Sequence, residues 1–273
     1  MYELLPLARP LAATMSTLAL TLGAALDPGP RAPTRPTSSR AGAVSPGAAS
    51  PGPPAPLAAA PATGCVRHGA ALRTHGWRGR RTVALTFDDG PWPDTAAFLR
   101  VLERRHVRAT FFQVGRQVRG QDRLERRILR DGDAIGNHTL NHPSLPAVPA
   151  RVGQELSLTS AIIHHTSGGY RPCLFRPPYG AYNSAIVQRA RADGMTTVIW
   201  DVDPRDWSRP GSRAIESRVM AQVRSGSIVL MHDGGGPREQ TLSALPRIIG
   251  DLRRRGYGLV TVPELLGYRT RHG

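Results

Sequence analysis

From Thr82 onward, the chain alternates short apolar runs with amphipathic stretches, and this alternation constrains the fold more than any other feature. Seven apolar runs predict strands at 82–87, 109–114, 134–136, 174–176, 196–202, 227–231 and 259–262. The segments between them predict helices at 95–105, 122–130, 151–164, 184–192, 214–223 and 238–254. Strands that alternate with helices form parallel α/β sheets. Because the candidate reactive residues follow the carboxyl ends of strands, we predict a (β/α) barrel rather than an open sheet.

The N-terminal part of the chain has a different composition. Residues 11–26 form an uncharged, mostly apolar run after Arg9, which is typical of a signal-peptide core, with an uncleaved membrane anchor as the alternative. The stretch that follows is rich in Pro, Ala, Ser and Gly and lacks the apolar content of a folded core. We expect a signal peptide or anchor over 1–26, a disordered linker over 27–75 and one globular domain over 76–273. Export would place that domain outside the cell or on the cell envelope.

The net charge and the cysteine content limit the kinds of partner and of covalent bond that we expect. The net charge is +16 and all 36 basic residues are Arg, so the surface is cationic at any physiological pH. Such a surface favours association with anionic polymers, including those of a cell wall. We do not expect nucleic-acid binding, because the Arg residues are scattered and no recognition motif accompanies them. Cys65 and Cys173 lack metal-binding spacing; in an exported chain they can form a disulfide, and the sequence leaves paired and free thiols both open.

Two segments together predict a metal site. Asp88 and Asp89 follow the first strong strand within TFDDGP, and adjacent carboxylates there require a compensating cation unless they form an ordinary Asp-Gly turn. His138 and His142 lie four residues apart in HTLNH, a spacing that places both imidazoles on one face of a helical turn. Two histidines and one carboxylate, with positions left open, are typical of a catalytic metal site rather than a structural one.

Three further segments place polar and aromatic residues after strands. In FRPPYG, Arg176 is positioned to pair with an aspartate, and the two prolines leave the N–H of Tyr179 as the next free donor for an oxyanion. The segment WDVDPRDW at 200–207 brings acids and an aromatic surface suited to sugar rings. The segment IVLMHDG is a strand that ends in His232.

In this order and spacing, the five segments resemble the motifs of the polysaccharide deacetylase family, carbohydrate esterase family 4, over residues 80–268. The resemblance implies an irregular (β/α) barrel, with 76–273 as its catalytic domain. It implies a metal triad of Asp89, His138 and His142. For the chemistry, it implies that Asp88 is the general base, that Arg176 orients Asp88, and that the backbone N–H of Tyr179 donates to the oxyanion. It also implies that His232 is the general acid and that Asp206 tunes the pKa of His232, with Asp203 as the alternative for this role. Trp207 and Leu230 would form the wall of the substrate groove.

The resemblance further implies a metal-dependent hydrolase that removes N-acetyl groups from an amino-sugar polysaccharide, chitin oligomers or peptidoglycan, and releases acetate. Two imidazoles and a carboxylate suit Zn²⁺, with Co²⁺ as the second choice. One alternative is an O-deacetylase of acetylated xylan, which would use the same residues. Another is a non-catalytic protein that binds wall glycans, which the complete set of acids and histidines disfavours. We expect a monomer.

Overall fold

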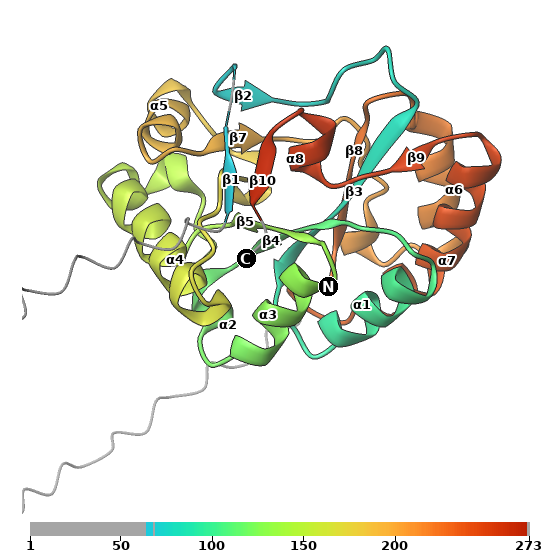
Figure 1. Cartoon of the computed structure of the whole chain (residues 1–273), viewed down its shortest axis with the longest axis horizontal. Coiled ribbons are helices and arrows are strands. Elements are labelled where there is room, and N and C mark those ends of the chain that lie inside the picture. The colour runs from blue at the N-terminus through green and yellow to red at the C-terminus, as the bar shows by residue number, and fades with distance from the viewer. Residues whose placement is uncertain (1–63, 68, 272–273) are drawn as a thin grey trace, which may run out of the picture. The chain divides into compact units, whose positions relative to one another are not determined.

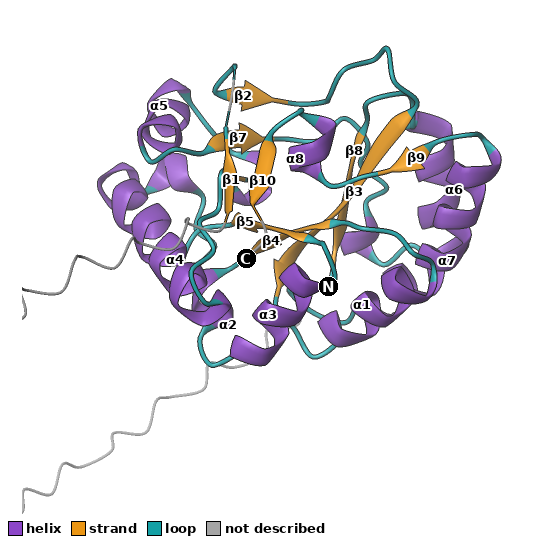
Figure 2. Ribbon diagram, in the orientation of Figure 1, coloured by secondary structure: helices purple, strands orange, loops and turns teal. Residues whose placement is uncertain are grey.

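A curled parallel sheet forms the centre of the computed structural model, which describes residues 64–67 and 69–271 (Figures 1 and 2). Its strands run in the order β2-β7-β6-β5-β4-β3-β8, and β9 pairs with the start of β3. The strands of this sheet are β2 (Leu72–Arg73), β3 (Thr82–Gly90), β4 (Thr110–Gln113), β5 (Ala134–Asn137), β6 (Leu174–Phe175), β7 (Thr196–Val198), β8 (Ile228–His232) and β9 (Gly258–Leu259). A parallel bridge between Val202 and Val229 joins the segment after β7 to β8, so the sheet curls back on itself. The predicted irregular (β/α) barrel is confirmed.

Strand β3 is the longest strand and lies in the core of the fold. Its residues 83–87 are fully buried, as expected for a parallel strand that is covered on both faces. The ring of Phe87 packs against Phe98 and Phe111, at centroid distances of 5.2 and 5.3 Å. Helices surround the sheet (Figure 2). They are α1 (Thr95–Arg104), α2 (Gly115–Val118), α3 (Asp122–Arg130), α4 (Val152–Ser167), α5 (Ser184–Ala192), α6 (Ser212–Gln222), α7 (Glu239–Arg254) and α8 (Val262–Leu265).

The predicted strand at 259–262 is wrong after its first residue. The strand β9 ends at Leu259, and Val262 begins the short helix α8. Thr261 and Glu264 form a capping box there, and Pro263 occupies the first turn, where its missing N–H has no helical partner to lose. Local capping therefore overrides the apolar run.

Residues before 76 also take part in the fold. Strand β1 (Gly64–Val66) pairs antiparallel with β10 (Arg269–Arg271), and β2 extends the main sheet beside β7. A disulfide joins Cys65 to Cys173, just before β6, with a Cα–Cα distance of 5.3 Å. The linker predicted over 27–75 therefore needs correction from Gly64 onward, because backbone pairing and the disulfide hold this segment.

The predicted signal peptide or anchor, and the linker up to residue 63, lie outside the described residues. Within 64–67 and 69–271, no helix combines the length and apolar character needed to cross a bilayer.

Candidate metal and catalytic site

A cavity of about 450 Å³ opens at the carboxyl ends of the central strands. The residues that line it are Asp88, Asp89, His138, His142, Tyr179, Trp200, Asp203, Trp207, Leu230 and His232. Eight of the ten residues with predicted roles are among them, and the other two, Arg176 and Asp206, lie directly behind. A larger hollow of about 550 Å³ lies between the first turns of α4 and α5, but no carboxylate or histidine lines it. The chemistry is therefore concentrated in the smaller cavity.

Asp89, His138 and His142 are close enough to share one metal ion, since one ligand atom from each lies within 4.8 Å of the others. Nε2 of His142 lies 3.0 Å from Oδ1 of Asp89, and Nε2 of His138 lies 3.5 Å from the same oxygen. That oxygen is buried and accepts no hydrogen bond within the described chain. Burial raises the pKa of Asp89, but the two histidines outweigh it, and the net effect is a lowered pKa. An ionised, unsatisfied carboxylate oxygen facing two imidazoles fits a divalent cation.

The orientation of His138 is fixed by its second ring nitrogen. Its Nδ1 lies 2.7 Å from the carbonyl oxygen of Arg176. Because a carbonyl only accepts hydrogen bonds, Nδ1 is the donor of this pair, and Nε2 is the ring nitrogen that faces Asp89. Metal-ligating histidines are typically held by such an outer hydrogen bond.

The segment from His138 to His142 is not the helical turn that the spacing predicts. Thr139 and His142 have left-handed backbone conformations, with φ of 66° and 59°. The carboxylate of the buried Glu155 accepts hydrogen bonds from the N–H groups of Leu140 and Asn141, each at 2.9 Å. Hydrogen bonds to Glu155 therefore hold the loop that brings the two imidazoles together, and their ring centroids lie 4.9 Å apart.

Adjacent carboxylates reach the cavity because the strand is irregular between them. The pairing of β3 with β4 shifts register between Asp88 and Gly90, and Asp89 has φ of 70°. In a regular strand, two successive side chains would point to opposite faces. The bulge brings the carboxylates of Asp88 and Asp89 to the same cavity.

Asp88 is paired with a fully buried guanidinium. Nη1 of Arg176 lies 2.7 Å from Oδ1 of Asp88 and 2.8 Å from Oγ1 of Thr86. The guanidinium carbon of Arg176 stands 4.0 Å from the ring centroid of Phe112 and 5.6 Å from that of Trp200. These contacts fix one carboxylate oxygen of Asp88 and leave the other, Oδ2, on the side of His138, 3.8 Å from its Nε2.

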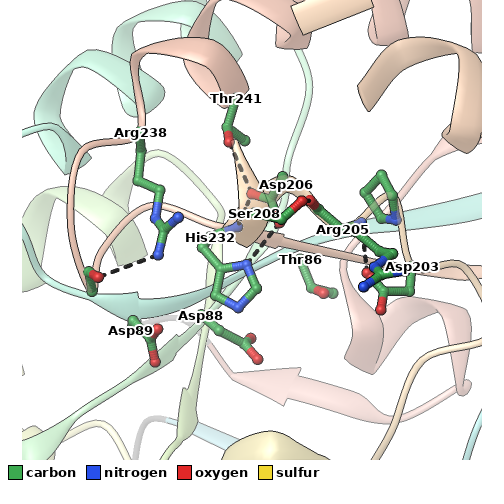
Figure 3. A network of polar contacts seen from close by, with 12 residues as sticks. Thr86, Asp88, Asp89, Asp203, Arg205, Asp206, Ser208, His232, Arg238 and Thr241 are labelled. Atoms are coloured by element: carbon green, nitrogen blue, oxygen red, sulfur yellow. Dashed lines mark hydrogen bonds and ion pairs between the residues drawn. The ribbon is translucent and has the colours of Figure 1, made fainter. Parts of the chain in front are cut away.

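Asp206, rather than Asp203, holds His232 (Figure 3). Oδ1 of Asp206 lies 2.8 Å from Nδ1 of His232, and Oδ2 accepts hydrogen bonds from the His232 N–H and the Thr241 hydroxyl, both at 2.9 Å. Burial lowers the pKa of His232, but the hydrogen bond and charge of Asp206 outweigh it and raise that pKa above its ordinary value. The carboxylate of Asp203 instead accepts a hydrogen bond from the Arg205 N–H at 2.7 Å.

Tyr179, Trp207 and Leu230 form the wall of the cavity. Tyr179 has a left-handed backbone with φ of 60°, and no acceptor in the described part of the chain pairs with its N–H. Its ring is exposed, and its hydroxyl lies 3.2 Å from Nδ1 of His142. Trp207 is 48% exposed whereas Leu230 is buried. The wall therefore combines a solvent-exposed aromatic ring with a buried apolar side chain.

Several supporting residues could not be assigned from the sequence. Glu155 lies on α4, 14 residues after Asn141, and Thr241 lies on α7, 35 residues after Asp206, and nothing in their local pattern marks them. Asp233 follows His232 and is completely buried, with a hydrogen bond from the Thr95 hydroxyl. Burial raises the pKa of Asp233 to about 7.

Fold and site together define a parallel (β/α)-barrel protein whose cavity holds an Asp/His/His set that fits a divalent metal ion. The family model for polysaccharide deacetylase matches residues 75–198. A peptidoglycan-N-acetylglucosamine deacetylase of Bacillus cereus is 40% identical over 196 residues, covering 69% of this chain and 90% of that protein. A chitooligosaccharide deacetylase of Bradyrhizobium is 40% identical over 200 residues, covering 68% and 91%. The crystal structure of a peptidoglycan N-acetylglucosamine deacetylase superimposes with a TM-score of 0.70 at 32% identity, over 74% of this chain and 94% of that one. The chain belongs to the polysaccharide deacetylase family, carbohydrate esterase family 4.

Proposed function

We propose that this protein is a metal-dependent N-deacetylase that hydrolyses acetamido groups of an amino-sugar polysaccharide to acetate and a free amine. The observation that carries the proposal is the cavity itself. It combines an Asp/His/His set, a carboxylate paired with Arg176 and a histidine paired with Asp206. The names of the two curated relatives support an N-acetylated glycan as substrate.

Asp89, His138 and His142 would hold the metal, and Zn²⁺ suits this donor set, with Co²⁺ as a second candidate. A divalent ion bound there would supply Lewis-acid polarisation of the acetyl carbonyl and lower the pKa of water.

Asp88 serves as the general base. Its oxygen Oδ1 is held by Arg176, and Oδ2 faces the ligand set, so one oxygen has a fixed partner and the other accepts a proton from the attacking water. The N–H of Tyr179 donates to the oxyanion that forms when the carbonyl carbon becomes tetrahedral. The side chains of Trp207 and Leu230 hold the sugar ring and the acetyl methyl group.

His232 serves as the general acid. An amide nitrogen leaves readily only as a protonated amine, because an amide anion is too basic to depart. The pKa of His232, raised by Asp206, favours the imidazolium that donates this proton. The base and the acid thus act on one substrate from adjacent strands.

Acting on a wall polymer requires export, and we propose that the N-terminal segment provides it and places the enzyme on the cell envelope or outside the cell. The cationic composition would favour association with anionic wall polymers.

Acetate release from three glycans tests the function: chitotetraose, peptidoglycan and acetylated xylan. The Zn²⁺-loaded full chain should release acetate from the amino-sugar substrates, and Asp88→Asn should bind the metal but lose about 10²-fold or more of the turnover. Asp203→Asn is the matched control, because it removes a carboxylate from the same cavity without touching Asp88 or His232. Acetate released from xylan alone would identify an O-deacetylase instead.

A further inference from the structure

One exposed arginine belongs to the loop between two residues that line the cavity. Arg205 lies between Asp203 and Trp207, is exposed, and places its guanidinium carbon 5.3 Å from the ring centroid of Trp207. Trp207 contacts this guanidinium and is still 48% exposed, so part of its ring surface remains available at the cavity.

The loop around Arg205 is built to hold this position. The residue has a left-handed backbone, with φ of 54°, stabilised by the hydrogen bond from its N–H to Oδ1 of Asp203. Its carbonyl oxygen accepts a hydrogen bond from the hydroxyl of Ser208 at 2.8 Å (Figure 3). From helix α6, Arg218 donates to the carbonyl of Pro204, and Gln222 forms hydrogen bonds with both backbone groups of Asp203. The base of this side chain is therefore fixed by the loop.

Apart from the ring of Trp207, the guanidinium of Arg205 has no charge partner in the described part of the chain. Its neighbour Asp203 is turned to the backbone N–H, and among the described residues no carboxylate lies within ion-pair distance of the Arg205 guanidinium. The other charges around the cavity are matched differently: Asp88 has Arg176, and Asp206 has His232. A guanidinium that is stacked on an aromatic ring and lacks a counter-ion is suited to a carboxylate brought by the substrate.

We propose that Arg205 is a specificity-determining residue that binds a carboxylate carried by the sugar next to the one being deacetylated. The inference rests on the proposed N-deacetylase function and narrows its substrate class to an acidic glycan. Peptidoglycan is such a glycan, through the lactyl group of its muramic residues or the acids of its stem peptide, whereas chitin oligomers carry no carboxylate. Trp207 holds the sugar ring, and Arg205 selects the substituent beside it.

The test compares two soluble glycans that differ only in this group. One is a peptide-free oligomer of alternating N-acetylglucosamine and N-acetylmuramic acid, and the other is the same oligomer with its carboxyl groups reduced to alcohols. For an exposed ion pair, we expect kcat/KM of the Zn²⁺-loaded full chain to favour the acidic oligomer by about 2- to 5-fold at low salt. The preference should shrink in about 1 M NaCl, where the Debye length falls to about 3 Å.

Arg205→Gln should bring the ratio of the two kcat/KM values close to one, and Arg205→Lys should retain part of it. Arg104→Gln, on the exposed end of α1, makes the same change of charge away from the cavity and should leave the ratio as in the wild type. A third glycan that keeps its stem peptide distinguishes the sources of the carboxylate: a further gain that Arg205→Gln abolishes would assign part of the binding to peptide acids.

Equal kcat/KM of the wild type on the acidic and reduced oligomers would overturn this inference and leave the deacetylase function standing. A preference for the acidic oligomer that persists in Arg205→Gln would overturn it as well. If the metal-loaded wild type released no acetate from either oligomer or from chitotetraose, the proposed function would fall, and this inference with it.

Discussion

Replacing Asp206 by Asn isolates the charge that supports His232. The side chain of Asp206 is fully buried, and its Oδ2 already accepts two hydrogen bonds, from the His232 N–H and from Thr241. The amide oxygen of an asparagine would keep those two bonds, so its NH₂ group would face Nδ1 of His232. That nitrogen would then have to accept a hydrogen bond, which excludes the imidazolium form. A hydrogen bond to a charged group contributes about 1.5–3 kcal/mol, so kcat/KM on an N-acetyl glycan should fall about 10- to 100-fold at neutral pH.

The pH profile of acetate release shows in which direction Asp206→Asn shifts the pKa of His232. A general acid works below its pKa, and Asp206 raises the pKa of His232, so Asp206→Asn should move the loss of activity at the basic side to lower pH. Asp203→Asn changes a carboxylate in the same loop without a contact to His232, and its basic limb should stay in place. An aryl acetate, whose leaving group needs no proton, should be affected far less. Equal losses on the aryl ester and the amide, or an unmoved basic limb, would refute the role of His232 as the acid for the leaving group.

Three further predictions concern the metal, the buried arginine and the disulfide. His138→Ala should lose bound metal and activity together, measured by elemental analysis and acetate release; full metal occupancy in a folded variant would contradict the ligand assignment. Arg176→Met leaves the carboxylate of Asp88 buried without its cation and should lower the free energy of unfolding by about 3–5 kcal/mol in chemical denaturation; an unchanged stability would mean that the pair is not formed. Reducing the bond between Cys65 and Cys173, which spans 108 residues, should lower stability by about 2–4 kcal/mol, and a double Cys→Ser variant should show the same loss and no response to reductant.

The sequence predicts much of the sheet because each strand is a short apolar run with its own flanking signals. Helices α3 and α5 have the predicted bounds, and the motif residues follow strands as expected. What the sequence does not predict depends on side-chain contacts that lie outside the apolar pattern, some of them local and some between separate elements. The loop that carries His138 and His142 is held by Glu155, and the capping box at Thr261 turns an apolar run into a helix. The pairing of Cys65 with Cys173 likewise depends on β1 reaching β10.

The register of two strands brings the proposed base and the proposed acid to one cavity. Asp88 and His232 are direct register partners on β3 and β8, although 143 residues lie between them (232 − 88 − 1). Adjacent strands lie about 4.8 Å apart, so the backbone ladder itself sets the separation of the two groups. Each member of this pair has its own charge partner: Arg176, which follows β6, contacts Asp88, and Asp206, from the loop after β7, contacts His232. Asp206 raises the pKa of His232, whereas Arg176 fixes the orientation of the Asp88 carboxylate. A slip of one residue between β3 and β8 would turn one of the two side chains away from the cavity, which ties the proposed chemistry to the packing of the core strand β3.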